Sequence, residues 1–226
     1  MYDKTPGLKS VLESRYNQVY LGSGVIGNYG LVTTFKWKTI GDLKGRKIAA
    51  AGPNIPWMQG SGVTVVQSNL NEAYTSFQTG VYEGWVMFPD AIISFKLNEV
   101  TKQYVDMDFG SIHTPLLTMN KASWNALPAN VRKIFLEVGK EWNGHIGRVI
   151  YEKQEAGRKQ MKVAGLDVQQ ADLAAKRAWA KGLPNIPKQR FEEIKKAGMP
   201  GEVVYTYIKA LKAAGHTFPR DWEAER

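Results

Sequence analysis

One segment, from Asn69 to Pro89, restricts the fold more than any other part of the sequence. Apolar residues recur in it at helical spacing, at Leu70, Ala73, Tyr74 and Phe77. Asn69 and Glu72 are spaced as a capping box, and Gly80 is placed to end the helix in the left-handed conformation. A short apolar run closed by proline follows, which predicts a buried strand that delivers its end to a loop. In an open α/β sheet, ligands bind beyond that end of a strand.

The segments around this one predict the rest of the sheet. A strand is expected at residues 47–51, a second at 63–66, and a third at 81–88 after the helix. Strand, helix and strand at this spacing form a βαβ unit. Shorter helices are expected at 8–18, 171–181, 188–196 and 203–214. The order predicts an α/β fold with a mostly parallel sheet and helices on its faces.

Residues 128–164 form the other large feature, because apolar residues from Val131 to Ile150 keep helical spacing, so one stripe of the predicted helix faces a core. Pro128 suits the first helical turn, and Gly165 suits the residue just after the last. An unbroken helix of this length would measure about 55 Å. Glycine weakens a helix interior by about 1 kcal/mol. The alternative is therefore two helices broken near Gly144 or Gly147.

Three motifs in a fixed order carry a family resemblance. They are Asp42-Leu43-Lys44-Gly45-Arg46-Lys47-Ile48, then Glu72-x-Tyr74, then Gln78-Thr79-Gly80-Val81-x-Glu83-Gly84. Over roughly residues 20–215, the chain resembles the solute-binding proteins of tripartite ATP-independent periplasmic (TRAP) transporters, dicarboxylate-binding type. The resemblance implies a two-lobed fold, similar to type II periplasmic binding proteins, with a long helix that spans both lobes. It also implies no enzymatic activity, no cofactor and no metal site.

The resemblance implies a division of the chain into three parts. Residues 1–40 would be the remainder of a first lobe and the crossover, 41–120 the ligand-binding α/β lobe, and 121–226 the long helix and the C-terminal helices. Members of the family have a further βαβ portion before the segment that matches Val19, and one helix precedes it here. The chain is therefore expected to be incomplete at its N-terminus. Family members are exported, and this sequence does not begin with a signal peptide.

Candidate ligand contacts lie around the expected strand ends, and they are Asn54, Trp57, Trp85, Met87, Phe88 and Asp90. Either tryptophan alone could equally be a core residue. The family commonly places an arginine after the isoleucine that Ile48 matches, where it holds the ligand carboxylate in a bidentate pair. Ala49 and Ala50 stand there instead. Large apolar faces without that donor predict an organic acid with an apolar or aromatic body.

The expected function is that of a periplasmic solute-binding subunit. It would capture a small organic acid for the membrane subunits of a TRAP-type transporter, without inserting into the membrane itself. An α/β enzyme acting on a small organic acid is the alternative, because fold does not settle function. Catalytic chemistry is scarce, however. The sequence has no cysteine, no H-E-x-x-H, P-loop or G-x-S-x-G motif, and three histidines (His113, His145 and His216) that lack metal-ligand spacing.

The segment Gly22 to Gly27 spells G-x-G-x-x-G, which is the fingerprint of dinucleotide-binding folds. That motif requires a following helix whose N-terminus holds the pyrophosphate. Residues 28–35 are instead rich in glycine, β-branched and aromatic residues, which favours a strand. A nucleotide site is therefore not expected here.

The net charge of +9 is concentrated in the second half of the chain. Residues 1–120 hold ten basic and nine acidic side chains, whereas residues 121–226 hold twenty and twelve. A basic face can attract nucleic acid. Here the basic residues alternate with acids along amphipathic helices, as on a solvated surface. No nucleic-acid partner is expected.

Overall fold

The structure is a computed structural model that describes residues 7–111 and 115–225. The chain forms two compact units, each assembled from separate stretches of sequence. Unit 1 comprises residues 1–24, 114–147 and 185–226, and unit 2 comprises residues 25–113 and 148–184. The expected functional division into residues 1–40, 41–120 and 121–226 stays a prediction.

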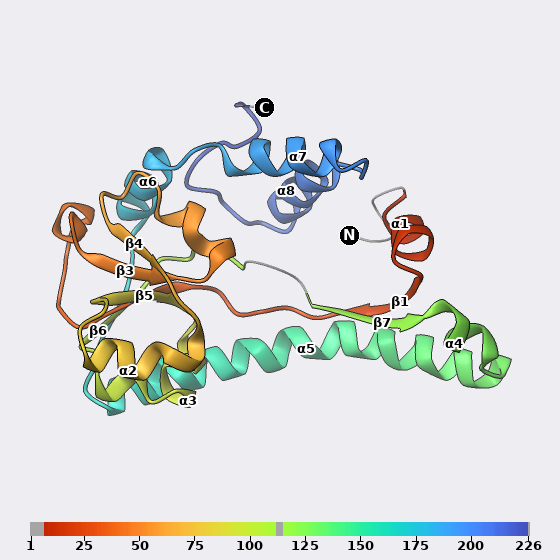
Figure 1. Cartoon of the computed structure of the whole chain (residues 1–226), viewed down its shortest axis with the longest axis horizontal. Coiled ribbons are helices and arrows are strands. Elements are labelled where there is room, and N and C mark those ends of the chain that lie inside the picture. Colours follow the sequence, from red (N-terminus) through yellow and green to blue (C-terminus); the bar gives the residue numbers. More distant parts are fainter. Residues whose placement is uncertain (1–6, 112–114, 226) are drawn as a thin grey trace. The chain divides into compact units, whose positions relative to one another are not determined.

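Helices and strands alternate along most of the chain (Figure 1). The α-helices within the described ranges are α1 (Leu8–Arg15), α2 (Ala73–Gln78), α3 (Pro89–Ser94), α4 (Lys121–Ala126), α5 (Ala129–Val163), α6 (Leu173–Gly182), α7 (Ile186–Lys196) and α8 (Val203–Ala213). The strands are β1 (Gln18–Ser23), β2 (Gly30–Thr33), β3 (Lys47–Ala50), β4 (Thr64–Gln67), β5 (Gly84–Met87), β6 (Gln103–Asp106), β7 (Leu116–Asn120) and β8 (Asp167–Gln170). Short 3-10 helices lie at Ile40–Leu43, Gly52–Met58, Leu70–Glu72 and Leu97–Glu99.

Unit 2 is built on a six-stranded sheet in the order β4-β3-β5-β2-β6-β8. Strand β3 is parallel to β4 and β5, and β6 is parallel to β8, so the predicted mostly parallel sheet is confirmed. Strand β2 runs antiparallel to both of its neighbours. Figure 1 shows α2, α3 and the C-terminal part of α5 along one side of this sheet and α6 on the other. Both faces are therefore covered, as a parallel sheet requires.

The helix predicted after Asn69 begins as a 3-10 turn and continues as α2. The side chain of Asn69 accepts a hydrogen bond from the Asn71 backbone N–H at 3.1 Å, so it caps the first turn one residue earlier than a capping box would. Gly80 has a φ of 74°, and Val81 N–H donates to the Ser76 carbonyl at 2.9 Å. This is the left-handed C-terminal cap that the sequence predicts.

Helix α5 is continuous over 35 residues, about 52 Å, and contributes to both units. The alternative of a break at Gly144 or Gly147 is therefore wrong. Gly165, with a φ of 86°, ends the helix, and Leu166 N–H donates to the Met161 carbonyl at 3.0 Å in a Schellman motif. No helix of the described ranges combines the length and the apolar character needed to cross a bilayer.

Two other glycines of α5 let the backbones of neighbouring elements approach closely. A Cβ on Gly139 would lie 2.1 Å from the carbonyl oxygen of Leu21 in unit 1. A Cβ on Gly157 would lie 2.8 Å from the carbonyl carbon of Pro89 in unit 2. Any side chain at either position would push the helix away from the element on which it packs.

Unit 1 contains the two-stranded antiparallel sheet of β1 and β7. Helix α1 ends earlier than the predicted residue 18, because Asn17 adopts a φ of 53° and β1 begins directly after it. Gly22 lies within β1, and no helix occurs between β1 and β2. The segment from Gly22 to Gly27 therefore lacks the helix N-terminus that would hold a pyrophosphate.

Candidate functional site

The candidate site is the edge of the unit 2 sheet at which β3 and β5 end. These strands are parallel, so their carboxyl ends share one edge. Strand β3 leads into the 3-10 helix that carries Asn54 and Trp57. Strand β5 leads into Phe88 and then into the first turn of α3, which carries Asp90. This is the edge at which open α/β sheets bind ligands.

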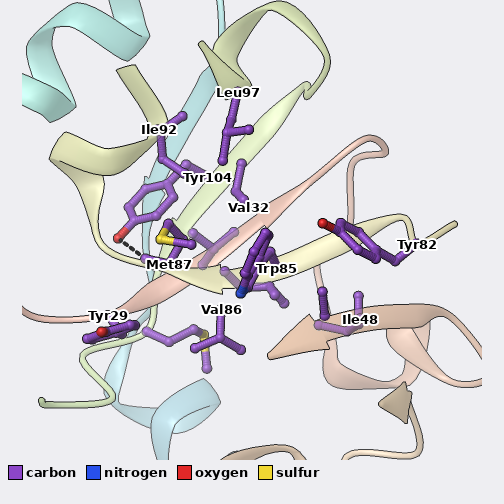
Figure 2. Close-up of a cluster of buried hydrophobic side chains, with 14 of the residues drawn as sticks. Tyr29, Val32, Ile48, Tyr82, Trp85, Val86, Met87, Ile92, Leu97 and Tyr104 are labelled. Carbon is purple, nitrogen blue, oxygen red and sulfur yellow. Dashed lines mark hydrogen bonds between the residues drawn. The ribbon is translucent and has the colours of Figure 1, made fainter. Parts of the chain in front are cut away.

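Four of the six predicted contacts, the large apolar side chains, divide between the two faces of the sheet. Successive side chains of a strand point to opposite faces. Trp85 and Met87 therefore share a face, and they are 2% and 4% exposed. Trp85 packs edge-on against Tyr82, with ring centroids 5.6 Å apart. Figure 2 shows Ile92, Leu97 and Tyr104 on that side of β5 and Tyr29 and Val86 on the other. Ligand contact by Trp85 and Met87 stays a prediction.

Phe88 and Trp57 lie on the opposite face, where they join an aromatic cluster. We define the aromatic cluster as Tyr29, Trp57, Phe88, Phe109 and Trp179. The Tyr29 ring stands edge-on to both Trp57 and Phe88, at centroid distances of 5.5 and 5.2 Å. The ring centroid of Phe109 lies 6.0 Å from that of Trp57 and 5.1 Å from that of Trp179. The indole N–H of Trp179 donates to the Trp57 carbonyl at 2.8 Å, which fixes the loop after β3.

Asn54 is the buried polar group of this edge. The side chain is 1% exposed, and its Nδ2 has no hydrogen-bond partner in the described ranges. A buried donor without an acceptor costs about 1–3 kcal/mol, so such groups call for a specific reason. Ala49 and Ala50, both 0% exposed, fill the end of β3 and supply no donor beyond the backbone.

Asp90 gives the edge a negative charge. Its side chain is half-buried and makes no ion pair or hydrogen bond with another side chain of the described residues; the hydroxyl of Ser94 donates to its backbone carbonyl instead. Burial, together with a smaller effect from the charge of Asp90, raises the pKa of Tyr29 to about 12. Tyr29 is therefore a neutral hydroxyl at physiological pH.

Two basic side chains lie near the end of β6, and both are already paired. The Arg158 Nε donates to Asp106 at 2.9 Å, and its Nη1 donates to Glu155 at 2.7 Å. The Lys176 ammonium lies 3.2 Å from Asp108. Burial opposes the charge of Arg158, but its contacts with Asp106 outweigh that effect and raise its pKa. These cations neutralise local carboxylates.

A cavity of about 580 Å³ lies at the other edge of the same sheet, between the end of β2 and the start of β5. Its lining includes Glu83, which belongs to the third motif of the family resemblance, and Glu99. Glu83 pairs with Arg46 at 2.5 Å, and Glu99 accepts a hydrogen bond from the Tyr74 hydroxyl at 2.8 Å. These two pairs therefore stabilise the fold at the edge of the sheet away from the candidate site.

Sequence reasoning missed Tyr29, Phe109 and Trp179, which come from three separate segments. The alternation of strand residues was the available signal for separating Trp85 from Phe88. Residues 7–111 and 115–225 hold no group of three histidine or acidic side chains that could bind a metal ion. His113 lies outside the described residues. The site thus offers aromatic faces, one amide donor and one carboxylate, which is the composition of a binding site for a small organic molecule.

Comparison with known proteins identifies the family. The sequence matches bacterial extracellular solute-binding protein, family 7, over residues 8–194. A solute-binding protein of Sulfitobacter sp. (strain NAS-14.1) is 30% identical over 127 residues, which cover 55% of this chain and 38% of that protein. The chain therefore belongs to this family, and the resemblance drawn from the three motifs is confirmed. The family consists of solute-binding proteins and not of enzymes.

Solved structures of TRAP periplasmic solute-binding proteins share the fold. The protein from Desulfovibrio salexigens, with bound orotic acid, has a TM-score of 0.75 and 22% identity over 92% of this chain and 66% of that chain. The protein from Pseudomonas putida F1, with bound D-glucuronate, has a TM-score of 0.69 and 22% identity over 80% of this chain and 59% of that chain. The predicted α/β binding-protein fold is confirmed. The chain spans less than two thirds of these relatives.

Proposed function

We propose that this chain is the solute-capturing part of a TRAP-type transport system. It acts outside the cytoplasm, in the periplasm, and passes a small organic acid to the membrane subunits of the transporter. The observation that carries the proposal is the composition of the edge shared by β3 and β5. It offers the ring of Trp57, the ring of Phe88 and the orphaned amide of Asn54. Such a wall binds and orients a small molecule but has no group placed for turnover.

The solute has an apolar or aromatic body. Ala49 and Ala50 provide no fork-shaped donor for its carboxylate, so the rings supply most of the contact from this wall. Family relatives bind both a planar ring acid and a polyhydroxylated one, orotic acid and D-glucuronate respectively. The aromatic cluster favours the first kind.

A thermal-shift screen of planar ring acids, sugar acids and C4-dicarboxylates tests the proposal, because a ligand that binds the folded state raises the melting temperature. Positive acids are then titrated by calorimetry against Phe88→Ala and against Phe95→Ala, a partly exposed phenylalanine that follows α3. Phe88→Ala should weaken binding about tenfold or more, and Phe95→Ala should leave it unchanged. Tight binding of succinate or glucuronate with no response to ring acids would contradict the apolar-bodied solute.

The enzyme alternative has its own outcome in the same experiment. A binding protein releases its solute unchanged, so mass spectrometry should recover each stabilising acid intact. Conversion of that acid by the purified chain would overturn the transport proposal. Capture of DNA or RNA that weakens steeply with salt would point to the basic surface instead.

A further inference from the structure

The charges of the candidate site do not match a simple carboxylate, and this mismatch deepens the proposed function, on which the inference rests. Near the end of β6, Arg158 pairs with Asp106 and Glu155, and Lys176 pairs with Asp108. Asp90, in contrast, makes no ion pair with a described residue. A bare carboxylate approaching Asp90 meets repulsion.

Asp90 is this unpaired carboxylate, and it is close in the sequence to a member of the aromatic cluster. It follows Phe88 by two residues, and its charge acts on the hydroxyl of Tyr29, which is itself a member of the cluster. No described cation or side-chain donor contacts it. A carboxylate accepts hydrogen bonds and attracts positive charge, so Asp90 is suited to a donor or a cation on the solute.

The rings beside Asp90 favour the same kind of group. A cation is attracted to the face of a tryptophan, tyrosine or phenylalanine ring, most strongly where water is excluded. Tyr29 meets both Trp57 and Phe88 edge-on, at interplanar angles of 83° and 79°. Rings that meet edge-on turn their faces in different directions. Trp57 and Phe88, unlike Tyr29, remain partly accessible.

Asn54 has the opposite requirement. Its buried Nδ2 is a donor without an acceptor in the described ranges. An oxygen of the solute would satisfy it, as a carboxylate or carbonyl does. This edge of the sheet is therefore suited to a hydrogen-bond acceptor beside Asn54 and to a positively charged donor beside Asp90.

We propose that the solute is a zwitterionic acid. Its cationic nitrogen faces Asp90 and the rings of Trp57 and Phe88, and its carboxylate or carbonyl oxygen accepts a hydrogen bond from Asn54. The chemical class is an amino acid or an N-methylated amino acid with an apolar or aromatic body. A non-aminated acid of the same shape lacks the group that Asp90 requires.

Pairs of compounds that differ only in the cationic nitrogen test this proposal. Glycine betaine is compared with 3,3-dimethylbutyrate, L-tryptophan with indole-3-propionate, and L-proline with cyclopentanecarboxylate, each titrated into the full chain by calorimetry. At least one zwitterion should bind about tenfold or more tightly than its neutral-bodied partner. Equal or tighter binding of the non-aminated acids overturns the inference but leaves the proposed function standing. If no member of any pair binds, and the wider acid panel is also silent, the proposed function fails with it.

Two variants locate the effect. Asp90→Asn keeps the shape and removes the charge, so the zwitterion should lose about tenfold in affinity while its partner gains or stays unchanged. Asp172→Asn is the matched control, because asparagine replaces aspartate well at the N-cap of α6, where Asp172 accepts from the Ala175 N–H. Asn54→Leu should weaken both members of a pair equally. An Asp90→Asn variant that is folded by circular dichroism and binds the zwitterion as tightly as before overturns the assignment to Asp90.

Discussion

Helix α5 contributes to both units, but it buries a large apolar side chain in unit 2 and leaves several exposed in unit 1. In unit 2, α5 places Met161 in the core at 0% exposure, and the large hydrophobic cluster of the described residues lies wholly in this unit. In unit 1, the same helix leaves Ile134 and Val138 56% and 54% exposed. The regular apolar spacing runs from Val131 to Ile150, so most of it lies in unit 1. An apolar stripe therefore indicates which side of a helix needs a partner, and the surrounding sheet decides whether one is present.

The sheets explain the contrast. Six strands with helices on both sides enclose the unit 2 core, whereas β1 and β7 form a sheet of two strands. A two-stranded sheet is marginally stable and covers little apolar surface. Leu116 and Leu117 of β7 are accordingly 38% and 45% exposed. We expect mutations to separate the two units clearly.

The largest separation should come from truncating one tryptophan in each unit. Trp85→Ala removes a side chain that is 2% exposed in the unit 2 core and should cost about 3–5 kcal/mol. Trp142→Ala removes a side chain of unit 1 that is 41% exposed and should cost less than about 1 kcal/mol. Urea unfolding followed by circular dichroism measures both. Equal costs would mean that unit 1 buries Trp142 in solution.

Ion pairs should show the next largest difference. Asp106→Asn breaks a pair in which the Asp106 and Arg158 side chains are 4% and 21% exposed, and it should destabilise unit 2 by about 3 kcal/mol. Glu137→Gln breaks the unit 1 pair with Lys133, where the side chains are 60% and 77% exposed, and should cost less than about 0.5 kcal/mol. Hydrogen exchange of β6 amides reports the first effect locally. Protection of β6 unchanged in Asp106→Asn would show that the buried pair contributes nothing to stability.

Two helix ends were predicted correctly from the sequence. Gly80 and Gly165 adopt the left-handed conformations expected of them because a helix end depends on neighbouring residues alone. The antiparallel direction of β2 was not predicted, since a strand buried on both faces has the same composition in either direction. The continuity of α5 through Gly144 and Gly147 depends on the packing of the whole helix, which outweighs the cost of two glycines.

The candidate site was predictable to the same extent. Asn54, Trp57 and Asp90 follow strand ends, so their place at one edge could be inferred from the order of elements. Tyr29 and Trp179 come from segments before β2 and in α6, and only the tertiary structure brings them together with Trp57. The pairing of Arg158 with Asp106 spans 52 residues and has no local signal.

A pH titration sharpens the comparison by testing how strongly the interior of unit 2 disfavours the ionised form of a buried side chain. Tyr29 is 5% exposed, and burial together with Asp90 raises its pKa from 10.0 to about 12. Its neutral form is favoured in the folded state, so the stabilisation is complete below pH 10 and is lost as the pH rises towards 12. The loss amounts to about 2–3 kcal/mol. Urea unfolding at intervals from pH 9 to 12 should show a steeper decline for the wild type than for Tyr29→Phe.

The Asp90→Asn variant provides the control for that titration. It removes the negative charge but leaves the burial, so the folded-state pKa of Tyr29 should be raised less, and the decline should end at a slightly lower pH and with a smaller total loss than in the wild type. Superimposable curves for the wild type and Tyr29→Phe would show that the Tyr29 hydroxyl reaches water in the folded state.

The smallest effect on stability, and the most direct probe of unit 1, should come from its exposed helix face. Ile134 and Val138 lie four residues apart on α5, and each is more than half exposed. Contiguous exposed apolar side chains favour association, so the wild-type chain should self-associate as its concentration rises in sedimentation experiments. Replacing them together, Ile134→Glu with Val138→Lys, substitutes a charged pair at helical spacing and should suppress that association. Stability should change by less than about 0.5 kcal/mol, because the side chains removed are already in water.

The control must keep the apolar face of α5 and leave its helix propensity unchanged. A double variant at Lys140 and Gly144 does not meet this condition, because replacing Gly144 by another residue would itself raise the helix propensity. Lys133→Glu with Glu137→Lys reverses an exposed pair one residue away and keeps the apolar face, so it should self-associate like the wild type. Association that persists in the Ile134→Glu, Val138→Lys chain would place the contact elsewhere and remove the distinction between an open unit 1 and a closed unit 2.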